Sequence, residues 1–229
     1  MNEALSVTTL PEAVYEAMRE RILAQREPPG ATVTEQAVAD RFGVARPTAK
    51  AALERLVSEG LLERSAHKTA RVPQLDRDDI VDLYANRAVI EEAALGMLAA
   101  SHAVPAAALS AQDVLVAAAA SPASASRDTG PLARADIAFH RALVEGQHSP
   151  RLARLHSLLM GEIELCTGQV LAHQLLALDH VVEQHRGIIE AVAEGDPERA
   201  GRLTRAHIEG ARDRLLDHFD SIHGLRDEG

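Results

Sequence analysis

From residue 76 onward the apolar residues recur every three or four positions, and this spacing restricts the fold more than any other feature of the chain. Residues three and four apart share one face of an α-helix, whereas a half-buried strand alternates at every second residue. No alternating pattern occurs after residue 72, so residues 74–229 are expected to form a mostly α, antiparallel helix bundle. The expected helices cover residues 76–100, 105–119, 131–147, 151–176, 178–194 and 197–219.

The composition agrees with a helical protein and excludes several classes. With two Tyr, three Phe and no Trp in 229 residues, helices are favoured over sheets. The single cysteine, Cys166, cannot form an internal disulfide, and no apolar run approaches the ~20 residues of a membrane span. The N-terminus lacks the basic and then apolar segments of a secretory signal. These features predict a cytoplasmic protein with no membrane partner.

The first 73 residues follow a different order of elements. Helices are expected over residues 10–25, 35–42 and 45–59, followed by two short strands over residues 61–64 and 69–72 around a turn. Helix, helix, short connection, helix and β-ribbon is the plan of a winged helix-turn-helix. We therefore expect a DNA-binding domain over residues 1–73 and a separate helical domain over residues 74–229.

Basic residues concentrate where this plan meets double-stranded DNA. The third helix enters the major groove, and the ribbon reaches the neighbouring backbone or minor groove. The candidate contacts are Arg46, Thr48 and Lys50 at the start of that helix and His67 and Lys68 at the ribbon tip. Residues 45–71 carry six Lys and Arg against three Glu. The formal net charge of −10, by contrast, comes entirely from the residues beyond position 72. The alternative interpretation is a solvated helix start on a small helical domain.

Residues 10–72 resemble the DNA-binding domain of the GntR family of bacterial regulators. The resemblance rests on Pro29-Gly30, on residues 43–56 (GVARPTAKAALERL) and on residues 59–62 (EGLL). It implies that Arg46, Thr48 and Lys50 contact DNA.

Three positions depart from the family pattern. Gln36 stands where relatives often have a DNA-contacting arginine, Lys50 replaces an arginine, and residues 65–68 lack the usual glycine at the wing tip. Lysine lacks the bidentate fork of arginine. These departures therefore bear on the operator sequence more than on DNA binding itself.

Asp136 and His140 lie four residues apart on the apolar face of one expected helix, so both side chains can reach one point. Burying an ionised carboxylate without a partner is costly, so another group must compensate it. His185 and His207 occupy inward positions on later helices. Imidazole and carboxylate ligands suit a divalent ion such as Zn²⁺, Ni²⁺ or Mn²⁺ in the core of a bundle. From the spacing alone, a metal site and a hydrogen-bonded polar core both remain open.

Residues 76–220 resemble the FCD ligand-binding domain of the FadR subfamily of GntR regulators. The matching stretches are residues 136–143 (DIAFHRAL), 184–191 (QHRGIIEA) and 206–208 (AHI). In metal-containing members these Asp and His positions are the ligands. The resemblance therefore assigns Asp136, His140, His185 and His207 to a divalent transition metal, zinc first, with nickel or manganese as alternatives.

Arg87 and Glu91 interrupt the apolar stripe of the first long helix of the bundle. One interpretation is an ion pair between positions i and i+4. The other is a buried guanidinium that receives an anionic ligand. Residues 87–91 (RAVIE) resemble the R-x-x-L-E motif of the family, whose arginine holds an effector carboxylate, and this implies an effector-binding role for Arg87.

Together these features predict a transcription regulator, not an enzyme. It would bind an inverted-repeat operator as a homodimer and sense a small carboxylate effector at the metal site, with repression as the family default. One alternative is a helical metal-dependent hydrolase fused to a DNA-binding module, for which Glu91 is the only inward candidate general base. Another is a regulator whose metal is purely structural.

Overall fold

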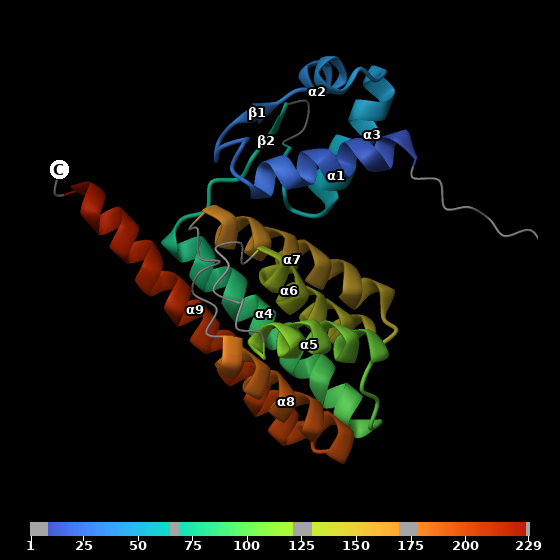
Figure 1. Ribbon diagram of the computed structural model, residues 1–229, viewed down its shortest axis with the longest axis vertical. Coiled ribbons are helices and arrows are strands. Elements are labelled where there is room, and N and C mark those ends of the chain that lie inside the picture. The colour runs from blue at the N-terminus through green and yellow to red at the C-terminus, as the bar shows by residue number, and fades with distance from the viewer. Residues whose placement is uncertain (1–8, 65–68, 121–129, 170–177, 228–229) are drawn as a thin grey trace, which may run out of the picture. The chain divides into compact units, whose positions relative to one another are not determined.

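The computed structural model describes residues 9–64, 69–120, 130–169 and 178–227 (Figure 1). The chain divides into two compact units, Met1–Leu75 and Asp76–Gly229. In the part of the chain that the structure describes, no helix is both long and apolar enough to cross a membrane.

The first unit contains the three helices expected of a helix-turn-helix domain: α1 (Leu10–Leu23), α2 (Glu35–Phe42) and α3 (Arg46–Ser58). The hydroxyl of Thr34 caps α2 by accepting a hydrogen bond of 3.0 Å from the Ala37 amide. Gly43 ends α2 in the left-handed region, at φ 65°, where a side chain would cause strain. This turn leads directly into α3, so the helix-turn-helix order is confirmed.

The β-ribbon of this unit is built differently from the sequence-based expectation. Strand β2 (Ala70–Arg71) pairs antiparallel with β1 (Thr32–Val33), a strand that precedes α2 and was not predicted. Of the strand expected over residues 61–64, only Glu63 pairs, through two backbone hydrogen bonds with Arg71. The two leucines before Glu63 are both buried, which a strand with alternating faces does not allow. The predicted pairing is therefore present only between Glu63 and Arg71, and the pairing of β2 with β1 was missed.

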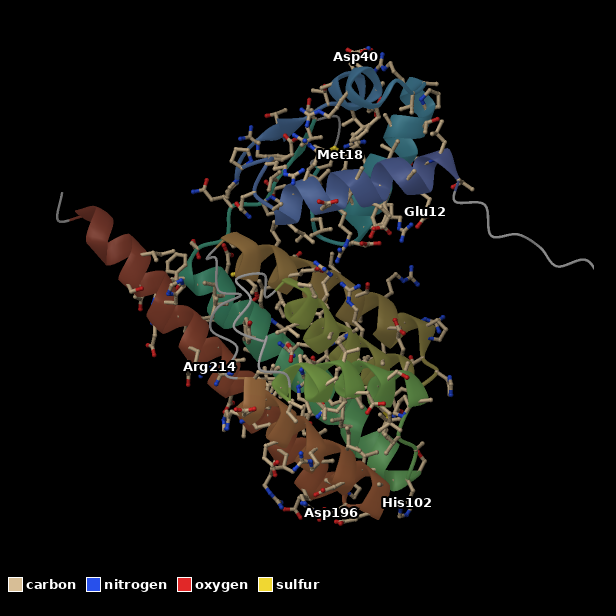
Figure 2. All side chains as sticks on the ribbon, viewed as in Figure 1. Glu12, Met18, Asp40, His102, Asp196 and Arg214 are labelled. Atoms are coloured by element: carbon tan, nitrogen blue, oxygen red, sulfur yellow. The ribbon has the colours of Figure 1, made fainter. Side chains whose placement is uncertain are left out.

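The core of the first unit joins α1 to α3. Met18 lies within it (Figure 2) and is 1% exposed. At its edge the Tyr15 hydroxyl donates a 2.6 Å hydrogen bond to Glu59, and the Arg55 guanidinium lies 3.6 Å from the centre of the Tyr15 ring. These contacts tie the two helices together, because a cation over an aromatic face is attractive.

The second unit is a bundle of six helices within the described ranges, as expected. They are α4 (Arg77–Ala100), α5 (Ala106–Ala119), α6 (Gly130–Glu145), α7 (Pro150–Gln169), α8 (Leu178–Glu194) and α9 (Pro197–Asp227). The Asp76 side chain and the Asp79 side chain form a reciprocal capping box at the start of α4. Helix α9 continues past its expected end at Phe219, because no proline interrupts it.

Helix α4 packs against α6, α7, α8 and α9 and is therefore the central element of the bundle. Phe139, the largest fully buried side chain of the chain's described part, belongs to the core between these helices. Two charged residues of α4, Arg87 and Glu91, are buried in the same interior. Glu91 contacts histidines of α6 and α7 there, so the polar groups of the interior meet at α4.

Candidate metal centre and effector pocket

Asp136 and His140 of α6, His185 of α8 and His207 of α9 meet inside the bundle. Each offers one ligand atom, and these atoms all lie within 4.8 Å of one another. The three histidines are at most 2% exposed, and the Asp136 side chain is 18% exposed. The Phe139 ring stacks on the His185 ring with centroids 3.8 Å apart, which holds that imidazole in place. The four residues singled out in the sequence are thus brought to one point.

A hydrogen bond at Nδ1 orients each imidazole. His140 Nδ1 lies 2.6 Å from a Glu91 oxygen, His185 Nδ1 lies 3.0 Å from Gln112 Oε1, and His207 Nδ1 lies 2.9 Å from Gln184 Oε1. The Gln112 amide is itself fixed, because its nitrogen donates to a backbone carbonyl of α8. Because the Nδ1 atom of each ring faces an acceptor oxygen, the Nε2 atoms are the ones turned to the centre of the cluster.

Two of the four atoms turned to the centre have no hydrogen-bond partner within the described part of the chain. His140 Nε2 lies 3.1 Å from His207 Nε2, so two ring nitrogens face each other. His185 Nε2 lies 3.4 Å from Asp136 Oδ1, and neither of these buried atoms receives a hydrogen bond. Buried polar atoms without partners are costly, and a cation at the centre would satisfy all four. Three imidazole nitrogens and one carboxylate oxygen therefore fit a divalent transition metal.

The protonation states of two of these histidines suit the same role. Burial lowers the pKa of His185 and of His207 well below the usual range of histidine, and the neighbouring His140 lowers both further. Both imidazoles are therefore neutral at neutral pH, and a neutral imidazole is the form that binds a metal.

Glu91 connects the cluster to Arg87. Its carboxylate accepts hydrogen bonds from Arg87 Nε at 2.8 Å, from His140 Nδ1 at 2.6 Å and from His156 Nε2 at 3.0 Å. Burial alone would raise the pKa of Glu91, but the Arg87 guanidinium and the two histidines lower it well below its usual range. Glu91 is thus a fully buried, ionised residue that is held in place by three donors. The ion pair with Arg87 is present, and the guanidinium is buried as well.

Sequence reasoning assigned no orienting role to three residues that hold this site in place: His156, Gln112 and Gln184. His156 was detectable in principle, because it lies four residues from both Leu152 and Met160 on the inward face of α7. The two glutamines carried no signal, since their roles depend on which histidine each one faces.

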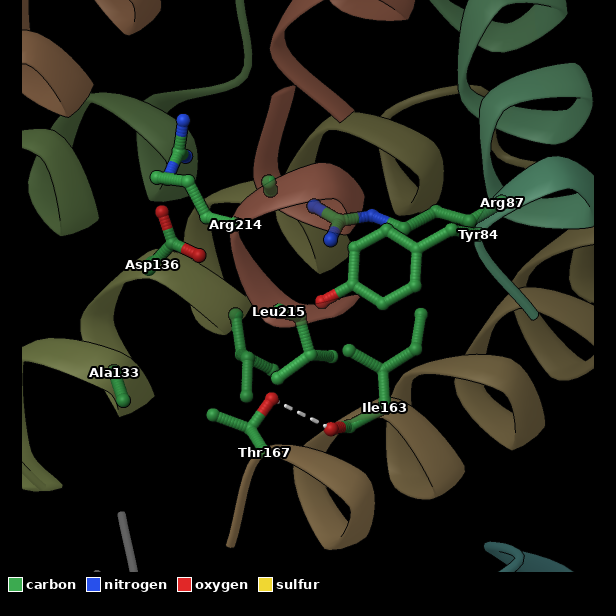
Figure 3. Close-up of a pocket in the computed structure, with 10 residues that line it drawn as sticks. Tyr84, Arg87, Ala133, Asp136, Ile163, Thr167, Arg214 and Leu215 are labelled. Atoms are coloured by element: carbon green, nitrogen blue, oxygen red, sulfur yellow. Dashed lines mark hydrogen bonds between the residues drawn. The ribbon is translucent and has the colours of Figure 1, made fainter. Parts of the chain in front are cut away.

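A cavity of about 80 Å³ adjoins the cluster and is lined by residues of α4, α6, α7 and α9 (Figure 3). A single water molecule takes up roughly 10–15 Å³ of such a cavity, so this one is large enough for a small organic molecule. Asp136 lies in its wall, beside the metal cluster. Arg87 also lines it, and Arg87 Nη2 is buried without a hydrogen-bond partner in the described part of the chain.

Three of the residues expected to contact DNA lie at the start of α3. Arg46 is its first residue, and its side chain is 63% exposed, 3.4 Å from the Glu35 carboxylate. Lys50 is exposed one turn further and lies 3.6 Å from Glu54, while Thr48 is half-buried. The two remaining candidates, His67 and Lys68, lie outside the described residues.

Comparison with known proteins gives one consistent result. A model of the FCD domain matches residues 82–210, and a model of bacterial regulatory proteins of the gntR family matches residues 10–72. A "probable D-xylose utilization operon transcriptional repressor" of Paenarthrobacter nicotinovorans is 30% identical over 208 residues, which span 90% of this chain and 89% of that protein. The repressor NanR of Salmonella newport is 27% identical over 186 residues, 73% of this chain and 70% of NanR.

Solved structures share the fold. A putative GntR transcriptional regulator from Rhodococcus sp. RHA1 superposes with a TM-score of 0.72 at 24% identity, covering 90% of this chain and 97% of that one. McbR/YncC of E. coli superposes with a TM-score of 0.68 at 18% identity, covering 92% and 99%.

Proposed function

The chain belongs to the GntR family of bacterial regulatory proteins and carries an FCD domain, and from this premise we propose that it is a transcriptional repressor that senses a small organic acid at a metal site. Membership of this family makes it a transcriptional regulator rather than an enzyme. Relatives named as repressors support the direction of regulation. The observation that carries the sensing role is the pair of buried acceptors, His185 Nε2 and Asp136 Oδ1, which face each other without a donor.

The metal would be held by Asp136, His140, His185 and His207, with zinc as the first candidate. When bound, such an ion supplies a Lewis-acid contact for a carboxylate oxygen. Arg87 would donate a charge-assisted hydrogen bond from Nη2 to the same carboxylate. Effector binding changes DNA affinity only if the effector prefers one arrangement of the regulator over another.

Metal analysis tests this proposal. Protein purified without a histidine tag or chelator should contain about one transition metal per chain, since three neutral imidazoles and a carboxylate are complete as a site. Asp136→Ala should lose most of it, whereas Asp113→Ala, which removes an exposed carboxylate of α5, should retain it. Elemental analysis by mass spectrometry gives the stoichiometry. The metal site is wrong if neither wild type nor variant contains or takes up Zn²⁺, Ni²⁺ or Mn²⁺.

One observation and one measurement separate this function from its alternatives. A hydrolase needs a free general base, and Glu91 is engaged by three donors. A purely structural metal predicts that DNA affinity stays the same across a panel of organic acids, whereas a sensor predicts that at least one acid lowers it.

The exposed side of α4 supports a homodimer, which would bind an inverted-repeat operator. Uncharged residues occupy every fourth position along it: Val81, Ala85, Val89, Ala93 and Met97. Val89 is 60% exposed and Met97 is 50% exposed. A two-fold axis through Val89 would place Val81 opposite Met97 and Ala85 opposite Ala93 of a second copy. Large residues would then face large residues, and alanines would face alanines. A two-fold interface requires such a self-complementary surface, and rows of this spacing pack against each other.

Val89→Glu is expected to raise the dimer dissociation constant by about 100-fold or more, because two carboxylates would oppose each other on the axis and such contacts cost several kcal/mol. Sedimentation equilibrium measures the constant. Val114→Glu is the matched control, since this valine of α5 is 50% exposed and lies off the row. If both variants remain as dimeric as the wild type, the interface lies elsewhere.

A further inference from the structure

A second arginine, Arg214 of α9, lines the effector cavity together with Arg87 (Figure 3). It lies seven residues after His207, which places both on the same face of the helix. Within the described residues Arg214 forms no ion pair and no hydrogen bond, unlike Arg87, which is bound to Glu91. A cation that lines a cavity without a protein partner is available to a ligand.

The charges around the cavity leave an excess of positive charge. Glu91 balances Arg87 through their ion pair. Asp136 would balance one of the two charges of a divalent metal. One charge of the metal and the charge of Arg214 then remain, so a ligand with two negative charges would neutralise the site. A monoanion would leave one cation without a counter-charge in a partly buried site.

We propose that the effector is a small dianion, a short dicarboxylate, and that Arg214 is the residue that selects it by binding the second carboxylate. This inference rests on the proposed function, because the first carboxylate occupies the position beside the metal and Arg87. The cavity of about 80 Å³ restricts the ligand to a few carbons. Ile137, Ile163 and Leu215 line it and would contact the carbon chain between the two carboxylates.

The remaining polar groups of the cavity are neutral and add no charge. Burial raises the pKa of Tyr84 to about 12, so its hydroxyl stays protonated. The Thr167 hydroxyl donates to the Ile163 carbonyl at 2.8 Å. Arg214 is therefore the group expected to distinguish a dicarboxylate from a monocarboxylate of equal length.

The test compares succinate with butyrate, two ligands of four carbons that differ by one charge, on the zinc-loaded full-length protein by isothermal titration calorimetry. Wild type should bind succinate at least about 10-fold more tightly than butyrate, because a charge-assisted hydrogen bond contributes that much or more. Arg214→Gln should weaken succinate by about 10- to 100-fold and leave butyrate unchanged. Arg202→Gln, an exposed arginine of the same helix that pairs with Glu198, should change neither. Zinc content, measured in parallel, should be equal in all three proteins.

Several results would overturn the inference. An Arg214→Gln variant that weakens both ligands equally, or neither, contradicts a selective role. So does a wild type that binds butyrate as tightly as succinate. If no dicarboxylate of three to five carbons binds but a monocarboxylate does, the dianion is wrong and the proposed function stands. If no carboxylate binds the zinc-loaded protein, both are wrong.

Discussion

Glu91→Ala is expected to lower the free energy of unfolding by about 3–5 kcal/mol, the cost of removing one partner from a buried ion pair. The change leaves the Arg87 guanidinium without its counter-charge in the interior of the bundle. It also leaves His140 Nδ1 and His156 Nε2 without their acceptor. Urea denaturation followed by circular dichroism at 222 nm measures the effect, with an unchanged m-value as the sign that the folded state is intact.

The neighbouring residue provides a matched control. Glu92 also pairs with an arginine, Arg205, but both side chains are about two-fifths exposed. Exposed pairs contribute about 0–1 kcal/mol, so Glu92→Ala should have a small effect. Equal losses in the two alanine variants would contradict a buried network around Glu91.

Glu91→Gln separates stability from metal binding. It keeps the shape of the side chain and removes the charge that holds His140 Nδ1–H. We expect about 10- to 100-fold weaker zinc binding, the usual effect of losing the group that orients a ligand. Zinc affinity from competition with a chromogenic chelator gives the number, and an unchanged affinity would mean that Glu91 does not position His140.

Arg46→Ala is expected to cost about 1–3 kcal/mol of DNA-binding free energy per half-site, the contribution of a specific arginine–base contact. Arg46 lies at the first position of α3, exposed and only loosely paired with Glu35. The measurement is fluorescence anisotropy on the duplex recovered by in vitro selection. If the contact is to a base, specificity at one position of each half-site should relax as well.

Two further variants, Lys50→Ala and Arg26→Ala, are compared with Arg46→Ala. Lys50→Ala should weaken all duplexes about equally and reduce the salt dependence by about one charge per chain if Lys50 contacts phosphate. Arg26→Ala removes an exposed charge that follows α1 and pairs with Glu20, outside the start of α3, so it should have little effect. A loss in Arg26→Ala as large as in Arg46→Ala would mean that overall charge, and not the start of α3, determines affinity.

The metal cluster marks the limit of what helical spacing can predict. Asp136 and His140 are four residues apart, so their common direction is fixed by one helix and was readable. That His185 and His207 point inward was also readable from the apolar residues around them. That these four atoms come within 4.8 Å depends on the packing of α6, α8 and α9, which resemblance to a family suggested and spacing alone did not.

The sequence by itself determined the helices and the direction of their faces, because spacing, caps and turn glycines act within a few residues. Helix α8 spans Leu178–Glu194, as expected, and the carboxylates of Asp76 and Asp79 mark the start of α4. The tertiary structure alone decided the pairing of β1 with β2, the hydrogen bonds of Gln112 and Gln184, and the approach of Arg214 to Arg87 across a cavity. The physical reason is that a helix pattern specifies which side is buried but not which neighbour covers it.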